Sequence, residues 1–346
     1  MSEEIKKGIS RRSFFKWSGL SFFSMMVWSK IRPSVSSAQV GRVKNYWNDQ
    51  GYFHQSNVDI SKIDQGIIRA KLKYEDWRTY NVVSTEAGFI NWNFTERINR
   101  IDKMIGGTMP AFGGAHNPFV ASFGGVLPED DAWNRSQFSL NNAVKGMGLA
   151  PKKVYIDSVI QGLKDHWDDS EEDRLLHLKA IYSNRDLWDM SKQVSLELYA
   201  TPDRLTHSFR NWMENPIANI GFMALEMQFA PPPPKLPTYE LRCVAHMIHP
   251  IDPDVDEYEM KLTIFSNTVH DFYHHTPGQL PPTPSEMNIG VIHYVCEEFD
   301  NYWGSSAQSK RVAMLRILDW TKNMYAKAFG KTTELFAKVT GRSRIA

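Results

Sequence analysis

Hydrophobic positions recur along the chain with two different periods, and together these periods predict a mixed fold. A spacing of three to four residues places apolar side chains on one face of a helix. The segments with this spacing are residues 95–105, 136–149, 171–182, 203–213 and 310–329. Because these segments do not alternate strictly with strands, their order favours an α+β fold built as a single mixed α/β domain.

The remaining patterns predict strands and irregular segments. Apolar and polar residues alternate over residues 239–245, and a short apolar run covers residues 154–160. The first pattern predicts a strand, and the second predicts a strand or a short buried segment. Residues 257–274 fit a helix and a strand equally well. Residues 39–80 are aromatic and polar without either period, so we expect an irregular lead-in that packs on the core.

Glycines concentrate between residues 106 and 125, where they include the run Gly113-Gly114-Ala115-His116. Glycine permits tight turns and a close approach of the backbone to its neighbours. The order of these glycines differs from that of known phosphate-binding loops. We therefore expect a structural loop here, with a ligand-contacting loop as the alternative.

The most specific motif of the sequence lies at the N-terminus. Residues 10–16 read S-R-R-S-F-F-K, which matches the twin-arginine export motif S-R-R-x-F-x-K. The defining residues of the motif are Arg11, Arg12, Phe14 and Lys16. An apolar stretch follows over residues 17–28, which is shorter than a membrane-spanning helix and typical of a signal peptide. Small residues ending at Ala38 fit a cleavage site, and an uncleaved N-terminal anchor is the alternative.

The export motif predicts a location and a partner. We expect the chain in the periplasm or at the outer face of the cytoplasmic membrane, delivered there by the twin-arginine translocase. Because this route exports folded proteins, often with a cofactor already inserted, the motif also favours a bound cofactor.

A proline-rich segment at residues 231–237 is the clearest interruption of the chain. A proline run favours extended polyproline II and is excluded from helix interiors and central strands. We expect either a seam within the globular domain or a rigid surface connector. The resulting division is a signal peptide at 1–38, an N-terminal part of the domain at 39–230, the connector at 231–237 and a C-terminal part at 238–346.

Composition and charge exclude several classes of protein. With 346 residues, of which 42% are hydrophobic and 23% charged, the chain resembles a globular protein rather than a disordered or coiled-coil one. The net charge of +1 gives no electrostatic case for nucleic acid as a partner. Residues 1–38 carry more basic than acidic residues, so the mature chain is mildly acidic.

The chain contains two cysteines, Cys243 and Cys296. Two thiols exclude a four-cysteine zinc site and any self-contained four-cysteine iron–sulfur cluster. One disulfide between them stays open in an oxidising compartment. Glu297 and Glu298 follow Cys296, and we expect their charges to raise its pKa and to disfavour a nucleophilic role.

Histidines concentrate in the last third of the chain. His270 and His274 are four residues apart, so on a helix they would share one face as two metal ligands can. With His293 they form a candidate mononuclear or dinuclear site for non-haem iron or zinc. The signatures H-E-x-x-H and paired E-x-x-H are absent. Histidines that are hydrogen-bonded or half-exposed are therefore the simpler alternative.

Residues 280–296 resemble a segment of the reductive dehalogenases. The family pattern is L-P-x-x-P-D-K-P-I-D-x-G-V-x-x-F-C, and this chain has Leu280-Pro281-Pro282-Thr283-Pro284, then Gly290-Val291 and Cys296. The distance from the leucine to the first cysteine agrees, and the glycine is displaced by one position. The S-R-R-x-F-x-K motif is also shared. The segment from Asn142 to Val159 is similar to the helix-then-strand segment of their corrinoid domain, and Phe329-Gly330 to the end of their C-terminal helix.

The chain departs from this family at the residues that carry electrons. Phe299, Tyr302 and Ser306 occupy the region where three more cluster cysteines are expected, and the second cluster motif is missing. Asp168 and Asp169 lie where the family's catalytic tyrosine is expected, so we assign no catalytic and no cofactor-binding residue.

The resemblance implies an exported, redox-associated protein that leans towards an oxidoreductase. It implies a corrinoid-domain-like (nitroreductase-like) fold without a ferredoxin domain, and a cobalamin-type corrinoid as cofactor. An electron-donor protein and a membrane-anchor subunit are the implied partners. The alternatives are a non-haem metal oxidoreductase that uses the histidine cluster, and a non-catalytic accessory subunit of an exported redox complex. The sequence does not fix the substrate.

Overall fold

The computed structural model describes residues 46–301, except residues 74, 109, 111–112, 125–139, 225–236 and 277. Within this part of the chain the fold is mixed α/β, as the sequence predicts. Several predicted features lie outside the described residues, namely Arg11, Arg12, Phe14 and Lys16 of the export motif, the helix over 310–329 and most of the proline-rich segment.

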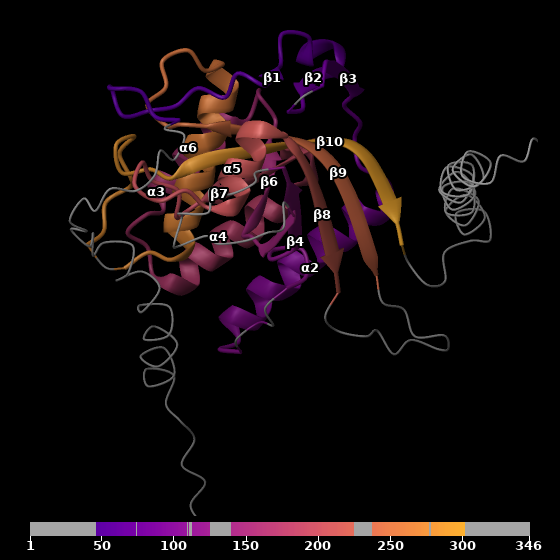
Figure 1. Cartoon of the computed structure of the whole chain (residues 1–346). Coiled ribbons are helices and arrows are strands. Elements are labelled where there is room, and N and C mark those ends of the chain that lie inside the picture. Colours follow the sequence, from indigo (N-terminus) through magenta and orange to yellow (C-terminus); the bar gives the residue numbers. More distant parts are fainter. Residues whose placement is uncertain are drawn as a thin grey trace, which may run out of the picture.

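Among the described residues, antiparallel strands form a small three-stranded sheet, β1-β2-β3, and a seven-stranded sheet in the order β5-β4-β8-β9-β10-β7-β6 (Figure 1). The strands are β1 (Val58–Asp59), β2 (Ile67–Lys71), β3 (Trp77–Asn81), β4 (Phe119–Phe123), β5 (Leu140–Val144), β6 (Met147–Pro151), β7 (Trp188–Glu197), β8 (Ile217–Met223), β9 (Thr238–Ile248) and β10 (Ile289–Asp300). The helices are α2 (Ala87–Ile105), α3 (Ile156–Asp165), α4 (Glu171–Ser183), α5 (His207–Glu214) and α6 (Glu257–Tyr273), with short 3₁₀ turns η1 (Ile63–Gln65) and η2 (Arg185–Leu187).

The chain itself joins the two ends of the seven-stranded sheet. β5 and β6 are its outermost strands, yet only Lys145 and Gly146 separate them. The backbone N–H of Lys145 donates to the carbonyl of Pro118 (3.2 Å), and that of Met147 donates to the carbonyl of His116 (2.8 Å). These bonds continue the pairing of β4 beyond β5. The sheet therefore curls on itself into a barrel with an inner and an outer face.

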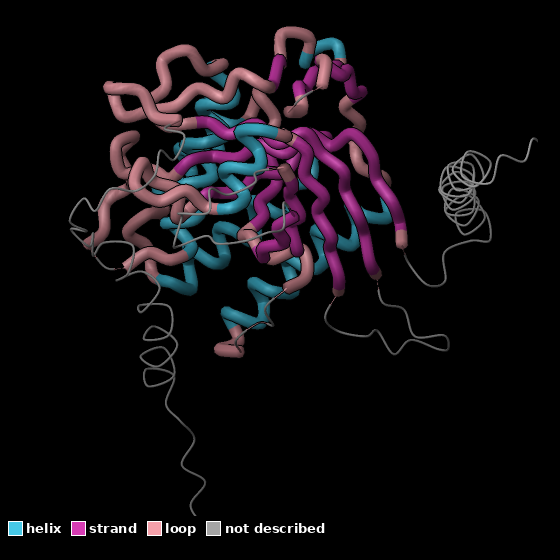
Figure 2. The backbone as a smooth tube through the Cα atoms, in the orientation of Figure 1, coloured by secondary structure: helices cyan, strands magenta, loops and turns pink. Residues whose placement is uncertain are grey.

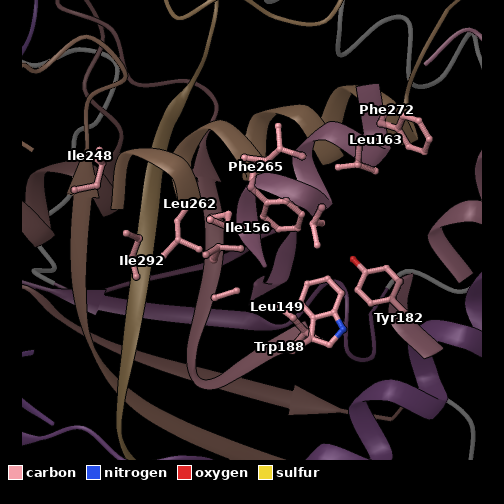
Figure 3. Close-up of a cluster of buried hydrophobic side chains, with 14 of the residues drawn as sticks. Leu149, Ile156, Leu163, Tyr182, Trp188, Ile248, Leu262, Phe265, Phe272 and Ile292 are labelled. Carbon is pink, nitrogen blue, oxygen red and sulfur yellow. The ribbon is translucent and has the colours of Figure 1, made fainter. Parts of the chain in front are cut away.

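Side-chain alternation along the strands divides the apolar residues into two cores. On the inner face, residues such as Met147, Ala245 and Val291 pack with Phe209 and Trp212 of α5. The outer face of β7, β9 and β10 is covered by α3, α4 and α6, which pack on a second core (Figure 3). The backbone tube shows these helices gathered on one side of the barrel (Figure 2). The barrel is thus helix-covered on one part of its wall.

Helix caps follow the local sequence. The Ser170 hydroxyl accepts a hydrogen bond from the backbone N–H of Asp173 (3.1 Å) at the start of α4. Asp256 accepts from the N–H groups of Tyr258 (2.9 Å) and Glu259 (3.2 Å) at the start of α6. Capping of this kind satisfies N–H groups that the helix cannot pair. It resolves residues 257–274 as a helix.

The structure confirms the helices predicted over 95–105, 171–182 and 203–213 and the strand over 239–245, within α2, α4, α5 and β9. It also confirms tight turns in the glycine-rich stretch, where Gly107, Gly113, Gly114 and Gly124 have positive φ. Residues 278–284 contain no helix or strand.

Three predictions of secondary structure are wrong. Residues 140–151 form β5 and β6 rather than a helix, and Gly146 and Gly148 disfavour a helix there. For residues 154–160 the predicted strand is wrong and the alternative of a short buried segment holds, because Ile156, Val159 and Ile160 lie on the face of α3 that packs on the outer core. Residues 58–81 form the three-stranded sheet rather than an irregular lead-in.

The proline-rich segment joins two neighbouring strands of one sheet. β8 ends at Met223 and β9 begins at Thr238, and these two residues face each other in the register. The chain before and after the segment therefore contributes to the same barrel. No helix of the described part of the chain has both the length and the apolar character needed to cross a membrane.

Candidate functional site

A partly open pocket of about 100 Å³ lies between α2, α4 and α6, on the outer side of β6 and β7. We name it the α2–α6 pocket. Its polar lining residues are Arg97, Arg100, His116, Tyr182, Ser195, Ser266, His270, Tyr273 and His274. Apolar side chains, including Ile101, Leu178 and Val269, complete the wall. Among the described residues that line it there is no Asp, Glu or Lys.

Two arginines of α2 reach the pocket because they lie three residues apart and share one helix face. Arg97 is buried, and its guanidinium donates to Asn93 Oδ1 (2.7 Å) and to the carbonyls of Ala115 (3.0 Å) and Met147 (2.8 Å). These acceptors are neutral oxygens, so the hydrogen bonds hold Arg97 in place without cancelling its charge. The guanidinium also lies over the ring of Tyr182, 5.5 Å from its centroid.

The last turn of α6 supplies three aromatic side chains to the same pocket. His270 and His274 face each other with ring centroids 5.0 Å apart, and the ring of Tyr273 lies 5.2 Å from that of His274. His270 Nδ1 is 3.0 Å from Asp271 Oδ1. The Tyr273 hydroxyl donates to the sulfur of Met104 and accepts from Arg100 Nε (3.3 Å). The phenol thus links α6 to the arginine face of α2.

His116 comes from the glycine-rich run that the sequence analysis singled out. Gly114 has a φ of 64°, a conformation that side-chain-bearing residues rarely adopt. A Cβ at Gly114 would also lie 3.2 Å from Glu96 Oε2. The turn brings the imidazole of His116 over Tyr273, with ring centroids 5.7 Å apart and 25° between the planes. The loop therefore contributes a side chain to the pocket, and ligand contact by the loop stays a prediction.

Burial sets the charge of the pocket. It lowers the pKa of His116 well below its usual value, with Arg100 and Arg97 adding to the effect. Burial, with His270 as the next cause, lowers the pKa of His274 to about 4. Both imidazoles are therefore neutral at pH 7, and the arginines carry the positive charge. Burial also raises the pKa of Tyr273, so its hydroxyl keeps its proton.

A second pocket, of about 290 Å³, lies on the other side of Arg97, Arg100 and His116. Its further lining includes Lys103 and the Gly113–Gly114 turn, together with Glu96, Asn99 and Asp102. The two pockets share three cationic or imidazole side chains as a common wall.

The structure brings together two of the three predicted metal ligands. His270 and His274 line the α2–α6 pocket, whereas His293 lies on the inner face of the barrel. There its Nε2 is 3.0 Å from Ser195 Oγ and its ring packs edge-on against Trp212 (5.5 Å). Among the described residues, no group of three His, Cys, Asp or Glu side chains is arranged to hold a metal ion. The three histidines do not form one site.

His293 is a structural residue of the barrel interior. It is fully buried, and burial together with the charge of Lys145 lowers its pKa to about 3. Lys145 pairs with Glu197 (2.6 Å) on the same inner face. Glu197 also accepts from the Thr206 hydroxyl (2.8 Å). The interior thus holds an ion pair within a polar cluster, in which His293 Nδ1 and Trp212 Nε1 are buried without a hydrogen-bond partner among the described residues.

Both cysteines are free thiols, Cys243 buried and Cys296 half-buried. The pKa of Cys296 is raised to about 11, in the predicted direction. Burial is the largest cause, and Glu297 makes a smaller contribution. The physical reason is therefore mainly desolvation rather than the neighbouring acids.

Comparisons with known proteins add little to this geometry. No protein-family model matches the chain, and no curated protein matches it. A solved structure of an F420 reductase matches over 54% of this chain and 91% of its own, with a TM-score of 0.26 and 10% sequence identity. At so low a score, the likeness carries no argument about the fold or ligand of this chain.

Sequence reasoning missed most of the pocket. Arg97 and Arg100 carry a visible signal, since two arginines at i, i+3 in a predicted helix form a charged face. Tyr273 lies between the two predicted histidine ligands, and the sequence analysis assigns it no role. Their convergence with His116 depends on barrel closure, which no local pattern shows.

Proposed function

We propose that this chain is an exported protein that binds a small organic anion in the α2–α6 pocket. The observation that carries the proposal is the charge of the lining: Arg97 and Arg100 are positively charged, and no carboxylate is among the described residues that line the pocket. An anion is attracted to such a site, and a cation is repelled from it.

The shape of the pocket defines the rest of the ligand. Arg97 is fixed by neutral hydrogen-bond acceptors, so its charge is pre-organised for an anion. Ile101, Leu178 and Val269 add apolar surface to the wall of the same pocket. A cavity of roughly 150 Å³ accommodates a benzene ring. A pocket of about 100 Å³ that opens to solvent therefore suits a small planar acid whose edge stays outside.

Export and redox association rest on the sequence. The S-R-R-x-F-x-K motif supports export through the twin-arginine translocase to the periplasm or the outer face of the cytoplasmic membrane. The resemblance to reductive dehalogenases supports a redox role with a donor protein and a membrane anchor. A role as an accessory subunit stays the alternative to an enzyme.

The corrinoid and the nitroreductase-like fold of its domain stay predictions of that resemblance. A corrinoid needs a cavity larger than the roughly 300–1,000 Å³ of ordinary small-molecule sites. The two pockets described above have about 100 and 290 Å³, and neither fits it. Non-haem iron or zinc has two neighbouring imidazoles, His270 and His274, as its only predicted ligands in the pocket. We derive no step through either group.

Calorimetric titration of the full chain with four small probes tests the proposal. Benzoate, benzyl alcohol and benzamidine share a ring and differ in charge, and inorganic phosphate is an anion without a ring. We expect benzoate to bind at least about tenfold more tightly than benzyl alcohol, a difference of about 1.4 kcal/mol, and benzamidine not to bind. Equal binding of benzamidine and benzoate would contradict an anion site. Tighter binding of phosphate than of benzoate would show that the apolar side chains of the pocket do not contribute to binding.

A further inference from the structure

Two imidazoles of the α2–α6 pocket keep ring nitrogens that are open to a ligand. The ring of His116 stacks on Tyr273, and within the described part of the chain its nitrogens make no hydrogen bond. His270 uses only Nδ1, which lies 3.0 Å from Asp271 Oδ1. The remaining nitrogens of both rings are not enclosed by protein atoms, although both side chains line the pocket.

Asp271 determines which nitrogen of His270 accepts a hydrogen bond. An ionised carboxylate only accepts, so Nδ1 of His270 carries the proton in the contact with Asp271 Oδ1. A neutral imidazole has one N–H donor and one acceptor nitrogen, and the partner of one nitrogen fixes the role of the other. The neutral ring of His270 therefore presents Nε2 to the pocket as an acceptor.

The donors of the pocket wall are engaged with other acceptors. The Tyr273 hydroxyl donates to the sulfur of Met104, and the Ser266 hydroxyl donates to the carbonyl of Leu262 (2.8 Å). A ligand is thus the natural source of the hydrogen that Nε2 of His270 accepts. A cationic donor such as an ammonium group is repelled by the two arginines, so a neutral hydroxyl suits this position.

We propose that the ligand of the α2–α6 pocket is a small aromatic acid with a hydroxyl group, which donates a hydrogen bond to Nε2 of His270. The inference rests on the proposed function, because Arg97 and Arg100 attract the anionic group of the same ligand. It adds the chemical class of the ligand and makes His270 the residue that selects it. An analogue without the hydroxyl leaves this acceptor unpaired and binds more weakly.

Calorimetric titration of the full chain at pH 8 tests the ligand class. The probes are benzoate, 3- and 4-hydroxybenzoate, and the two corresponding methoxybenzoates. At this pH carboxyl groups, with pKa values of about 4, are ionised, and phenols, with pKa values of about 10, keep their protons. We expect one hydroxybenzoate to bind at least about fivefold more tightly than benzoate. Its methoxy analogue, which keeps the oxygen but lacks the donor, should bind no more tightly than benzoate.

Variants of His270 test the residue that selects the hydroxyl. His270→Phe keeps a ring but removes the acceptor, so we expect it to bind the preferred hydroxybenzoate and benzoate equally. His270→Gln restores an acceptor oxygen and should retain a preference of at least about twofold. His207→Phe is the matched control, because His207 belongs to α5 and lines neither pocket, and it should show the native preference. Thermal unfolding verifies that each variant folds.

The outcomes separate this inference from the proposed function. If benzoate binds and neither hydroxybenzoate binds more tightly, the inference is overturned and the anion site stands. The native preference in His270→Phe, or equal affinities for the hydroxy acid and its methoxy analogue, would also overturn the inference. If none of the acids binds, both the inference and the proposed function fail.

Discussion

At the scale of single residues, histidines with similar sequence surroundings acquire different roles from the positions of their backbones. His270 and His274 share one face of α6, so their helical spacing was enough to predict that they lie together. His293 lies on the inner face of β10, because its strand position points it into the barrel. The predicted triad therefore fails at the residue whose direction depends on strand register, which a single sequence does not show.

His293 makes folding stability depend on pH. Its pKa is about 3 in the folded state and 6.5 without the fold, so the unfolded chain binds a proton that the folded chain excludes. This lowered pKa contributes stability above pH 6.5 that is lost as the pH falls towards 3. When the pH is lowered from 7.5 to 5, we expect the unfolding free energy of the native chain to fall by about 2 kcal/mol more than that of His293→Gln. Urea unfolding at both pH values measures the difference.

Ser195→Ala is the control for this pH effect. It removes the hydroxyl that lies 3.0 Å from His293 Nε2 but keeps the titrating ring. Its unfolding free energy should fall on acidification as much as that of the native chain. If His293→Gln loses as much stability on acidification as Ser195→Ala does, the titration of His293 is not the cause.

At the scale of elements, the sequence predicts those whose signals are local. α4 begins at Ser170 with acidic residues in its first turn, and its bounds nearly match the predicted segment. The segment of β5 and β6 is predicted as one helix. Each strand has only five residues, so its alternation of apolar and polar side chains is a weaker signal than the helical spacing that the apolar residues show by chance. Their strand character comes from pairing with β4 and β7, which are distant in sequence.

The contact between α6 and β10 depends on a glycine. A Cβ at Gly290 would lie 2.3 Å from Thr263 Oγ1 and 2.9 Å from Thr263 Cβ, so the helix would have to shift. We expect Gly290→Ala to cost about 1–3 kcal/mol of unfolding free energy, measured by urea denaturation. Adding Thr263→Ala should recover part of the loss, because it removes the nearest atom.

Gly221 provides a matched control on β8 of the same sheet. The nearest atom to a Cβ there is the Phe119 carbonyl oxygen at 3.9 Å, an ordinary contact distance. Gly221→Ala should therefore cost less than about 1 kcal/mol. If Gly290→Ala and Gly221→Ala lose equal amounts of unfolding free energy, the close packing of α6 on β10 is not the cause of the loss.

At the scale of the whole molecule, closure of the barrel creates the α2–α6 pocket, which no single segment of the sequence predicts. The short link at Lys145 and Gly146 returns the chain from one edge of the sheet to the other, and it places β6 against α2 and α6. The mixed fold class follows from the sequence patterns. The pocket does not, because its arginines, His116 and the end of α6 come from three segments that only the closed barrel brings together.

Export is a property of the whole chain and has its own test. Replacing Arg11 and Arg12 by lysine keeps the charge but removes the guanidinium groups, which lysine does not replace in recognition. We expect the native chain in the extracytoplasmic fraction of expressing cells and the double variant in the cytoplasm. A variant with Lys6 and Lys7 replaced by glutamine, outside the motif, should be exported. Equal export of all three chains would refute the twin-arginine assignment.

The most direct test of the account is the benzoate affinity of Arg100→Gln measured beside that of Arg78→Gln. Arg100 lines the α2–α6 pocket, whereas Arg78 is an exposed residue of β3 that pairs with Glu75. Because glutamine keeps a polar side chain but removes the charge, we predict at least tenfold weaker binding for Arg100→Gln and native affinity for Arg78→Gln. Native affinity in Arg100→Gln, or an equal loss in both variants, would contradict an anion site between α2 and α6.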